Sequence, residues 1–251
     1  MSPKLRGPQG PALLPAFFDR PLAHRGYHDL DKGRPENSQA AFAAACAAGY
    51  GIELDLQLSR DGVAMAFHDE DLTRLTGRTG AVSDLTAAEL AALPLLGTAE
   101  QPPRLSETLA LVAGRAPLLI ELKSQSTPAA NRALAKATAQ DLSAYAGPVA
   151  LMSFDPQAVE SCAEAAPGLP RGLTTAAEPY HWPNPPQAWP PNPADYQASF
   201  LSHQHDALDL PQIGALKSAG HRILCWTIRS PEDAQAARAI AENITFEAFA
   251  P

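Results

Sequence analysis

Cysteine, aromatic side chains and long apolar runs are all scarce in this chain of 251 residues. The three cysteines, Cys46, Cys162 and Cys225, are odd in number and lack metal-type spacing, which argues against a disulfide framework and fits a reducing compartment. No run approaches the ~18 apolar residues of a transmembrane helix, and early prolines interrupt any apolar leader. We therefore expect a cytoplasmic protein without stable membrane insertion.

Basic residues are also in deficit, since 19 Lys and Arg face 27 Asp and Glu, for a formal charge of −8. This balance argues against nucleic acid or an anionic membrane as the main partner, because both reward clusters of Lys and Arg. It leaves a small phosphate substrate open, because a bound cation can supply positive charge locally. The oligomeric state is not specified by the sequence.

Proline is in surplus, with 25 residues, or about 10% against a usual ~5%. Five prolines lie within residues 1–21 and seven within residues 179–193. We therefore expect a Pro-rich N-terminal arm over residues 1–20 and one domain over residues 21–251, with a Pro-rich insert at 179–193. The insert carries Tyr180, His181, Trp182 and Trp189. It is either a stiff surface loop or a lid that contacts the substrate's headgroup.

Short β-rich runs alternate with Ala-rich helical runs, which predicts a (β/α)₈ TIM barrel. The expected strands are Pro21–Arg25, Gly51–Ser59, Val63–His68, Leu118–Leu122, Val149–Phe154, Arg171–Thr174, Ser199–His203, Arg222–Ile228 and Asn243–Phe246. The expected helices are Ser38–Ala48, Thr86–Leu93, Ser106–Ala113, Pro128–Ala144, Pro156–Ala165, Leu210–Ala219 and Pro231–Ala241. Nine strands exceed a barrel by one, and Asp61-Gly62 predicts that the extra strand belongs to a hairpin. A two-residue turn there would place Asp55 opposite His68.

Polar side chains gather at the predicted carboxyl ends of four strands, where a barrel of parallel strands forms its active site. They comprise three carboxylates (Glu53, Asp55, Glu121), two imidazoles (His24, His68) and two cations (Arg25, Lys123). Glu53 and Asp55 are two residues apart and so share one face of a strand. Two carboxylates among apolar neighbours need compensation, because burying an unpaired charge is costly.

Carboxylates without thiolates suit Mg²⁺ or Ca²⁺ better than Zn²⁺, and such an ion stabilises charge on a phosphate oxygen. Arg25 and Lys123 would hold the remaining phosphate oxygens, while two histidines can serve as general base and general acid. The set therefore predicts a phosphodiester-cleaving site. Taken alone, Glu121 and Lys123 are equally well explained as a structural ion pair. His203 and His205 beside Asp206 form a weaker alternative metal site.

From Pro21 to Ile228 the sequence resembles the glycerophosphodiester phosphodiesterase family. The resemblance is carried by His24-Arg25-Gly26, Pro35-Glu36-Asn37-Ser38, Glu53-Leu54-Asp55, Asp61-Gly62, His68-Asp69 and Glu121-Leu122-Lys123. It implies hydrolysis of glycerophosphodiesters to glycerol 3-phosphate and an alcohol. It also implies acid/base roles for His24 and His68, one divalent cation at the three carboxylates, phosphate contacts from Arg25 and Lys123, and a glycerol pocket walled by Trp226.

The sequence departs from the family at its last strand, where Phe246-Glu247 replaces the usual Thr-Asp. We expect Glu247 to stand in for the Asp at the substrate pocket. His28, close behind the first motif, is expected in a solvated loop. Two other functions stay open: a lysophospholipase D on the same fold, and a non-catalytic barrel that binds glycerophosphodiesters. Neither the alcohol nor the choice between Mg²⁺ and Ca²⁺ is specified.

Overall fold

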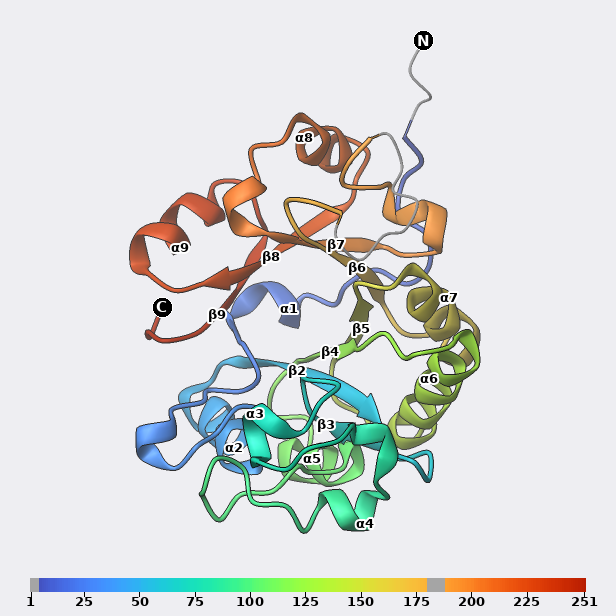
Figure 1. Ribbon diagram of the computed structural model, residues 1–251. Helices are drawn as coiled ribbons and strands as arrows, with labels where there is room; N and C mark the ends of the chain where they lie inside the picture. The colour runs from blue at the N-terminus through green and yellow to red at the C-terminus, as the bar shows by residue number, and fades with distance from the viewer. Residues whose placement is uncertain (1–4, 180–187) are drawn as a thin grey trace.

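Eight parallel strands form a closed ring in the computed structural model, which describes residues 5–179 and 188–251 (Figure 1). The ring runs in the order β1, β9, β8, β7, β6, β5, β4, β2, and β1 closes it by pairing with β2. Its strands are β1 (Leu22–Ala23), β2 (Gly51–Leu58), β4 (Leu118–Leu122), β5 (Val149–Ser153), β6 (Arg171–Thr175), β7 (Phe200–Gln204), β8 (Arg222–Ile228) and β9 (Asn243–Phe246). The predicted TIM barrel is confirmed.

The extra strand β3 (Ala64–Ala66) pairs antiparallel with β2, as the hairpin signal predicted. The predicted register is wrong by one residue, because Leu58 pairs with Ala64 and the amide of Phe67 donates to the carbonyl of Asp55 at 3.0 Å. The cause is a three-residue turn, in which Gly62 takes a left-handed φ of 81°. His68 lies two residues beyond β3, so the following loop positions it rather than the strand ladder.

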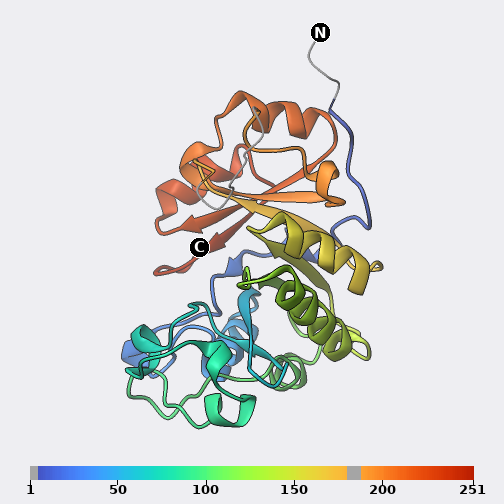
Figure 2. The same cartoon turned by 45° about the vertical axis from the view of Figure 1, so that its right-hand side comes forward.

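Helices surround the ring, and Figure 2 shows α6 and α7 packed side by side on its outside. The helices are α1 (Ala16–Asp19), α2 (Gln39–Ala48), α3 (Thr73–Thr76), α4 (Ala87–Leu90), α5 (Leu105–Val112), α6 (Pro128–Leu142), α7 (Pro156–Ala165), α8 (Pro211–Ser218) and α9 (Pro231–Arg238). Side-chain caps begin several of them; Ser230, for example, accepts from the amide of Asp233 at the start of α9. Among these nine helices, α1 and α3 were not predicted, because each is a single turn, too short to show a period, and lacks the side-chain cap that begins the equally short α4.

The amino-terminal end of the barrel is closed by residues that precede β1. Leu13 and Phe17 are buried in one cluster with apolar side chains from the strands. That cluster also contains Leu22, Leu119, Ala150, Met152, Phe200 and Leu224. The side-chain amide of Asn243 donates to the carbonyls of Phe17 and Arg20, both at 2.7 Å. Part of the predicted arm therefore packs into the barrel.

A small lobe over residues 63–95, which includes β3, α3 and α4, lies beside the carboxyl end of β2. It has its own apolar cluster, with Met65, Phe67, Leu72 and Leu75 among the buried members. The lobe carries His68 and the residues that follow it to the edge of the barrel. No helix in the described residues is long and apolar enough to cross a membrane.

Candidate active site

A cavity of about 650 Å³ opens at the carboxyl ends of the strands. The predicted residues that line it are His24, Arg25, Glu53, Asp55, His68, Glu121, Lys123 and Trp226. They come from β2, β4, β8 and the segments after β1, β3 and β4, so the barrel brings together residues that are up to 202 positions apart. Glu247 is the one predicted site residue outside this lining, and it lies behind His24.

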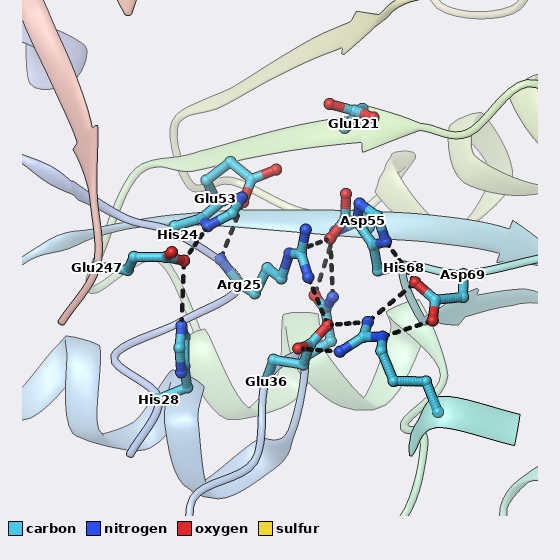
Figure 3. A network of polar contacts seen from close by, with 12 residues as sticks. His24, Arg25, His28, Glu36, Glu53, Asp55, His68, Asp69, Glu121 and Glu247 are labelled. Carbon is cyan, nitrogen blue, oxygen red and sulfur yellow. Dashed lines mark hydrogen bonds and ion pairs between the residues drawn. The ribbon is translucent and has the colours of Figure 1, made fainter. Parts of the chain in front are cut away.

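Three buried carboxylates form the centre of the site (Figure 3). Asp55 and Glu121 are register partners on neighbouring strands, and oxygen atoms of Glu53, Asp55 and Glu121 lie within 4.8 Å of one another. Burial and the charges of Asp55 and Glu121 raise the pKa of Glu53 well above its ordinary value. Such crowding of like charges calls for a cation, and an all-oxygen donor set fits Mg²⁺ or Ca²⁺. In the described residues, this is the one His, Cys, Asp and Glu cluster tight enough for an ion.

Lys123 supplies part of the compensating charge. Its Nζ lies 2.8 Å from Oδ1 of Asp55 and 2.5 Å from Oε1 of Glu121. Burial acts to lower the pKa of Lys123, but the two carboxylates outweigh it and the pKa is raised. The ion pair that sequence reasoning left as an alternative is therefore present, and it lies in the cavity wall.

Arg25, in the segment after β1, contacts two of the three buried carboxylates, Glu53 and Asp55. Its backbone is left-handed, with φ of 55°, and its amide donates to Glu53 at 2.9 Å. Nη1 of its guanidinium donates to Glu36 at 2.7 Å, and Nε lies 3.5 Å from Asp55. Gly26 follows at φ of 80°, where a Cβ would come within 3.0 Å of α2 atoms, so only glycine fits the turn.

Asn37 holds Asp55 at two points. Its Nδ2 donates to Oδ2 of Asp55 at 2.9 Å, and its Oδ1 accepts from the Asp55 amide at 3.2 Å. The side chain of Asn37 is buried beside the barrel, so both contacts are shielded from water. Sequence reasoning assigned no role to Asn37, although the motif Pro35-Glu36-Asn37-Ser38 pointed to this segment.

His24 is held by a carboxylate from the last strand end. Its Nδ1 lies 2.5 Å from Oε2 of Glu247, while Arg229 binds Oε1 through Nε at 2.8 Å and Nη2 at 2.7 Å. Burial lowers the pKa of His24, and the hydrogen bond from His24 to the carboxylate of Glu247 acts in the opposite direction. His28, expected in a solvated loop, instead places Nε2 3.5 Å from Glu247. The position of His28, four residues after His24, was the sequence feature that could have indicated a place near the site.

His68 has a matching partner in Asp69, whose Oδ1 lies 2.7 Å from its Nδ1. Burial lowers the pKa of His68, while the charge of Asp55 opposes that shift. In both histidines the ring's Nδ1 therefore faces a carboxylate, which leaves Nε2 for a ligand. Arg74 binds Asp69 in turn, and sequence reasoning did not find that arginine.

Trp226 on β8 and Phe154, the residue after β5, form an aromatic wall of the cavity. The indole of Trp226 donates to the carbonyl of Ser202 at 3.2 Å and meets Phe154 edge to face, with centroids 5.3 Å apart. Both residues line the cavity, and the glycerol contact expected of Trp226 stays a prediction. The described end of the Pro-rich insert places Trp189 Nε1 3.0 Å from the carbonyl of Ala176, just after β6. Tyr180, His181 and Trp182 lie outside the described residues, and the choice between loop and lid stays a prediction.

The alternative histidine site does not face this cavity. His203 is fully buried, and its Nδ1 lies 2.7 Å from the hydroxyl of Thr175. It is the register partner of Cys225, whose side chain is buried in an apolar cluster that strand residues form with residues of the surrounding helices. Burial lowers the pKa of His203 to about 4.

The sequence profile of the glycerophosphoryl diester phosphodiesterase family matches residues 24–243. A glycerophosphodiester phosphodiesterase from Caldanaerobacter subterraneus subsp. tengcongensis is 30% identical over 226 residues, covering 84% of this chain and 86% of that protein. The solved glycerophosphodiester phosphodiesterase of Thermotoga maritima is 27% identical with a TM-score of 0.71, covering 90% of this chain and 92% of its own. A phosphodiesterase of Oleispira antarctica, solved with the product sn-glycerol-3-phosphate, shares the fold with a TM-score of 0.77 at 24% identity. The match covers 95% of this chain and 93% of that one.

The family profile covers the barrel from β2 to β8 and includes the predicted acid/base, metal and phosphate residues from His24 to Lys123. The bacterial relative extends the likeness over most of both chains. The chain therefore belongs to the glycerophosphodiester phosphodiesterase family and is an enzyme that hydrolyses glycerophosphodiesters.

Proposed function

We propose that this enzyme hydrolyses small glycerophosphodiesters to glycerol 3-phosphate and an alcohol, with a divalent cation and two histidines as acid and base. The observation that carries the proposal is the arrangement of the cavity. Three buried carboxylates with oxygens within 4.8 Å lie in a cavity that two carboxylate-held imidazoles also line. The product complex of the Oleispira antarctica protein supports glycerol 3-phosphate as the product.

Glu53, Asp55 and Glu121 would hold the cation. When bound, it would supply Lewis-acid stabilisation of the charge that develops on a phosphate oxygen. Asn37 fixes Asp55 for this task through its two hydrogen bonds. The raised pKa of Glu53, caused by burial and by its two acidic neighbours, supports a site that binds positive charge.

Arg25 and Lys123 would orient the phosphate, because both line the cavity beside the carboxylates. Glu247 and Asp69 hold Nδ1 of the two histidines, so each Nε2 can exchange a proton with the substrate. One histidine takes the proton of the attacking hydroxyl, and the other protonates the leaving alkoxide. A glycerol hydroxyl can attack first to give a cyclic phosphate, which water then opens.

The decisive experiment is turnover by chelator-treated protein with and without added Mg²⁺ or Ca²⁺. We expect release of glycerol 3-phosphate from glycerophosphocholine, glycerophosphoethanolamine or glycerophosphoinositol only with metal. His24→Ala and His68→Ala should each lower kcat by about 10²- to 10⁴-fold. Full activity in chelator would overturn the metal assignment, and turnover of a lysophospholipid alone would identify a lysophospholipase D.

A further inference from the structure

Arg74 joins two carboxylates that serve different parts of the site. It lies on α3 in the 63–95 lobe, and 46% of its side chain is exposed. Its guanidinium donates to Asp69 from Nε at 2.6 Å and from Nη2 at 2.9 Å. It also donates to Glu36 from Nη1 at 2.7 Å and from Nη2 at 2.8 Å. Two carboxylates thus share one rigid, planar donor group.

Each of these carboxylates holds a residue of the reaction (Figure 3). Asp69 accepts at 2.7 Å from Nδ1 of His68, and Glu36 accepts at 2.7 Å from Nη1 of Arg25. Arg74 is therefore the middle member of a chain of alternating charges that begins at the phosphate-side arginine and ends at the imidazole. The chain crosses from the segment after β1 to the lobe after β3.

Both carboxylates are ionised under this arrangement. Burial acts to raise the pKa of Asp69, but the hydrogen bonds from Arg74 and His68 bring it down to about 2. Burial also acts to raise the pKa of Glu36, and Arg74 and Arg25 outweigh it. Without Arg74, Asp69 would lose two of the three side-chain hydrogen bonds described above and could turn away from His68. Of the hydrogen bonds described above, Glu36 would keep the one from Arg25.

We propose that Arg74 is a positioning residue, which fixes the ring of His68 and the guanidinium of Arg25 relative to each other through Asp69 and Glu36. This inference rests on the acid/base role proposed for His68. Arg25 keeps its contact with Asp55 when Arg74 is absent. Removing the Arg74 guanidinium should therefore lower kcat strongly and change KM only slightly.

The test compares Arg74→Gln and Arg74→Lys with Arg60→Gln in the metal-loaded enzyme. Arg60 is a matched control, because it pairs with Glu89 at 3.1 Å beside the same lobe and lies outside the cavity. We expect Arg74→Gln to lower kcat about 10- to 100-fold with KM changed less than about threefold. Arg74→Lys keeps a positive charge but cannot make the guanidinium's paired hydrogen bonds, so kcat should fall less than in Arg74→Gln. Arg60→Gln should stay within about twofold of the wild type.

A double-mutant cycle separates positioning from general destabilisation. If Arg74 acts through Asp69, adding Arg74→Gln to Asp69→Asn should cost less than about threefold in kcat. Equal costs in both backgrounds, or an Arg74→Gln enzyme as active as Arg60→Gln, would overturn the proposal. Histidine ¹⁵N spectra give a readout without substrate, since the Nδ1–H form of His68 should dominate in the wild type and decline in Arg74→Gln. A wild type inactive on every glycerophosphodiester would defeat the proposed function, whereas the spectra would still decide the role of Arg74.

Discussion

Replacing Glu247 with glutamine removes a charge from behind His24 while preserving the size of the side chain. The two groups are 2.5 Å apart, and their side chains are only 14% and 16% exposed, so water screens the contact little. A hydrogen bond to a charged group contributes about 1.5–3 kcal/mol, which corresponds to about 10- to 150-fold in rate. Because Arg229 binds the other oxygen, with a hydrogen bond from Nε and an ion-pair contact from Nη2, the amide oxygen should face Arg229. The amide N–H would then face Nδ1 of His24 and favour the wrong tautomer.

The assay is steady-state hydrolysis of glycerophosphocholine by the metal-loaded enzyme. We expect Glu247→Gln to lower kcat by about 10- to 150-fold and to change KM much less, because proton transfer is impaired while the shape of the cavity is unchanged. Glu242→Gln is the matched control, since Glu242 pairs with Lys217 at 3.2 Å at the opposite end of β9. The reasoning is refuted if Glu247→Gln keeps more than half of the wild-type kcat, or if the two variants are equally active.

Three further predictions concern stability and metal binding. Phe17→Ala should destabilise the fold by about 3–5 kcal/mol and lower Tm by about 10 °C in a thermal melt. Leu14→Ala, at an exposed site, should change Tm little. Equal Tm values for the two variants would contradict the packing of Phe17 into the barrel. Since the folded pKa of His203 is about 4 and the ordinary value is 6.5, the unfolded chain binds the proton first as pH falls. Stability should therefore drop by about 3 kcal/mol between pH 6.5 and 4, and a urea titration of His203→Gln should lack this drop; a drop as large as the wild type's would refute it. Asn37→Ala should weaken Mg²⁺ or Ca²⁺ activation about 10- to 100-fold, and an unchanged metal dependence of activity would refute the anchoring of Asp55.

The strands and most of the site could be predicted because both depend on local patterns. Alternating and apolar runs mark the strands, and a parallel barrel brings together whatever polar residues follow them. Glu53 and Asp55 share a face because side chains alternate along a strand, and the cavity contains both. These inferences need no knowledge of distant contacts.

The failures came where a contact depends on turn geometry or on residues far apart in the chain. The hairpin register slipped because Asp61-Gly62 suits two turn lengths, and the left-handed Gly62 closes the longer one. Glu36, one of the two partners of Arg74, and Glu247, the partner of His28, are 38 and 219 residues away, so neighbouring residues did not indicate these two contacts. A single arginine or histidine carries no local signal that identifies a partner so far along the chain.

The closure of the ring links the two ends of the chain in one functional unit. His24 follows the first strand and Glu247 follows the last, 223 positions away, and Asn243 grips the backbone before β1 over a similar span. Contacts of this range form late, because closing a long loop costs entropy before it brings any contact. A chain still emerging from the ribosome can assemble the Asp55 side of the site but not the His24 side. Catalytic activity thus requires a completed barrel, because Glu247 reaches His24 only once β9 has paired with β1.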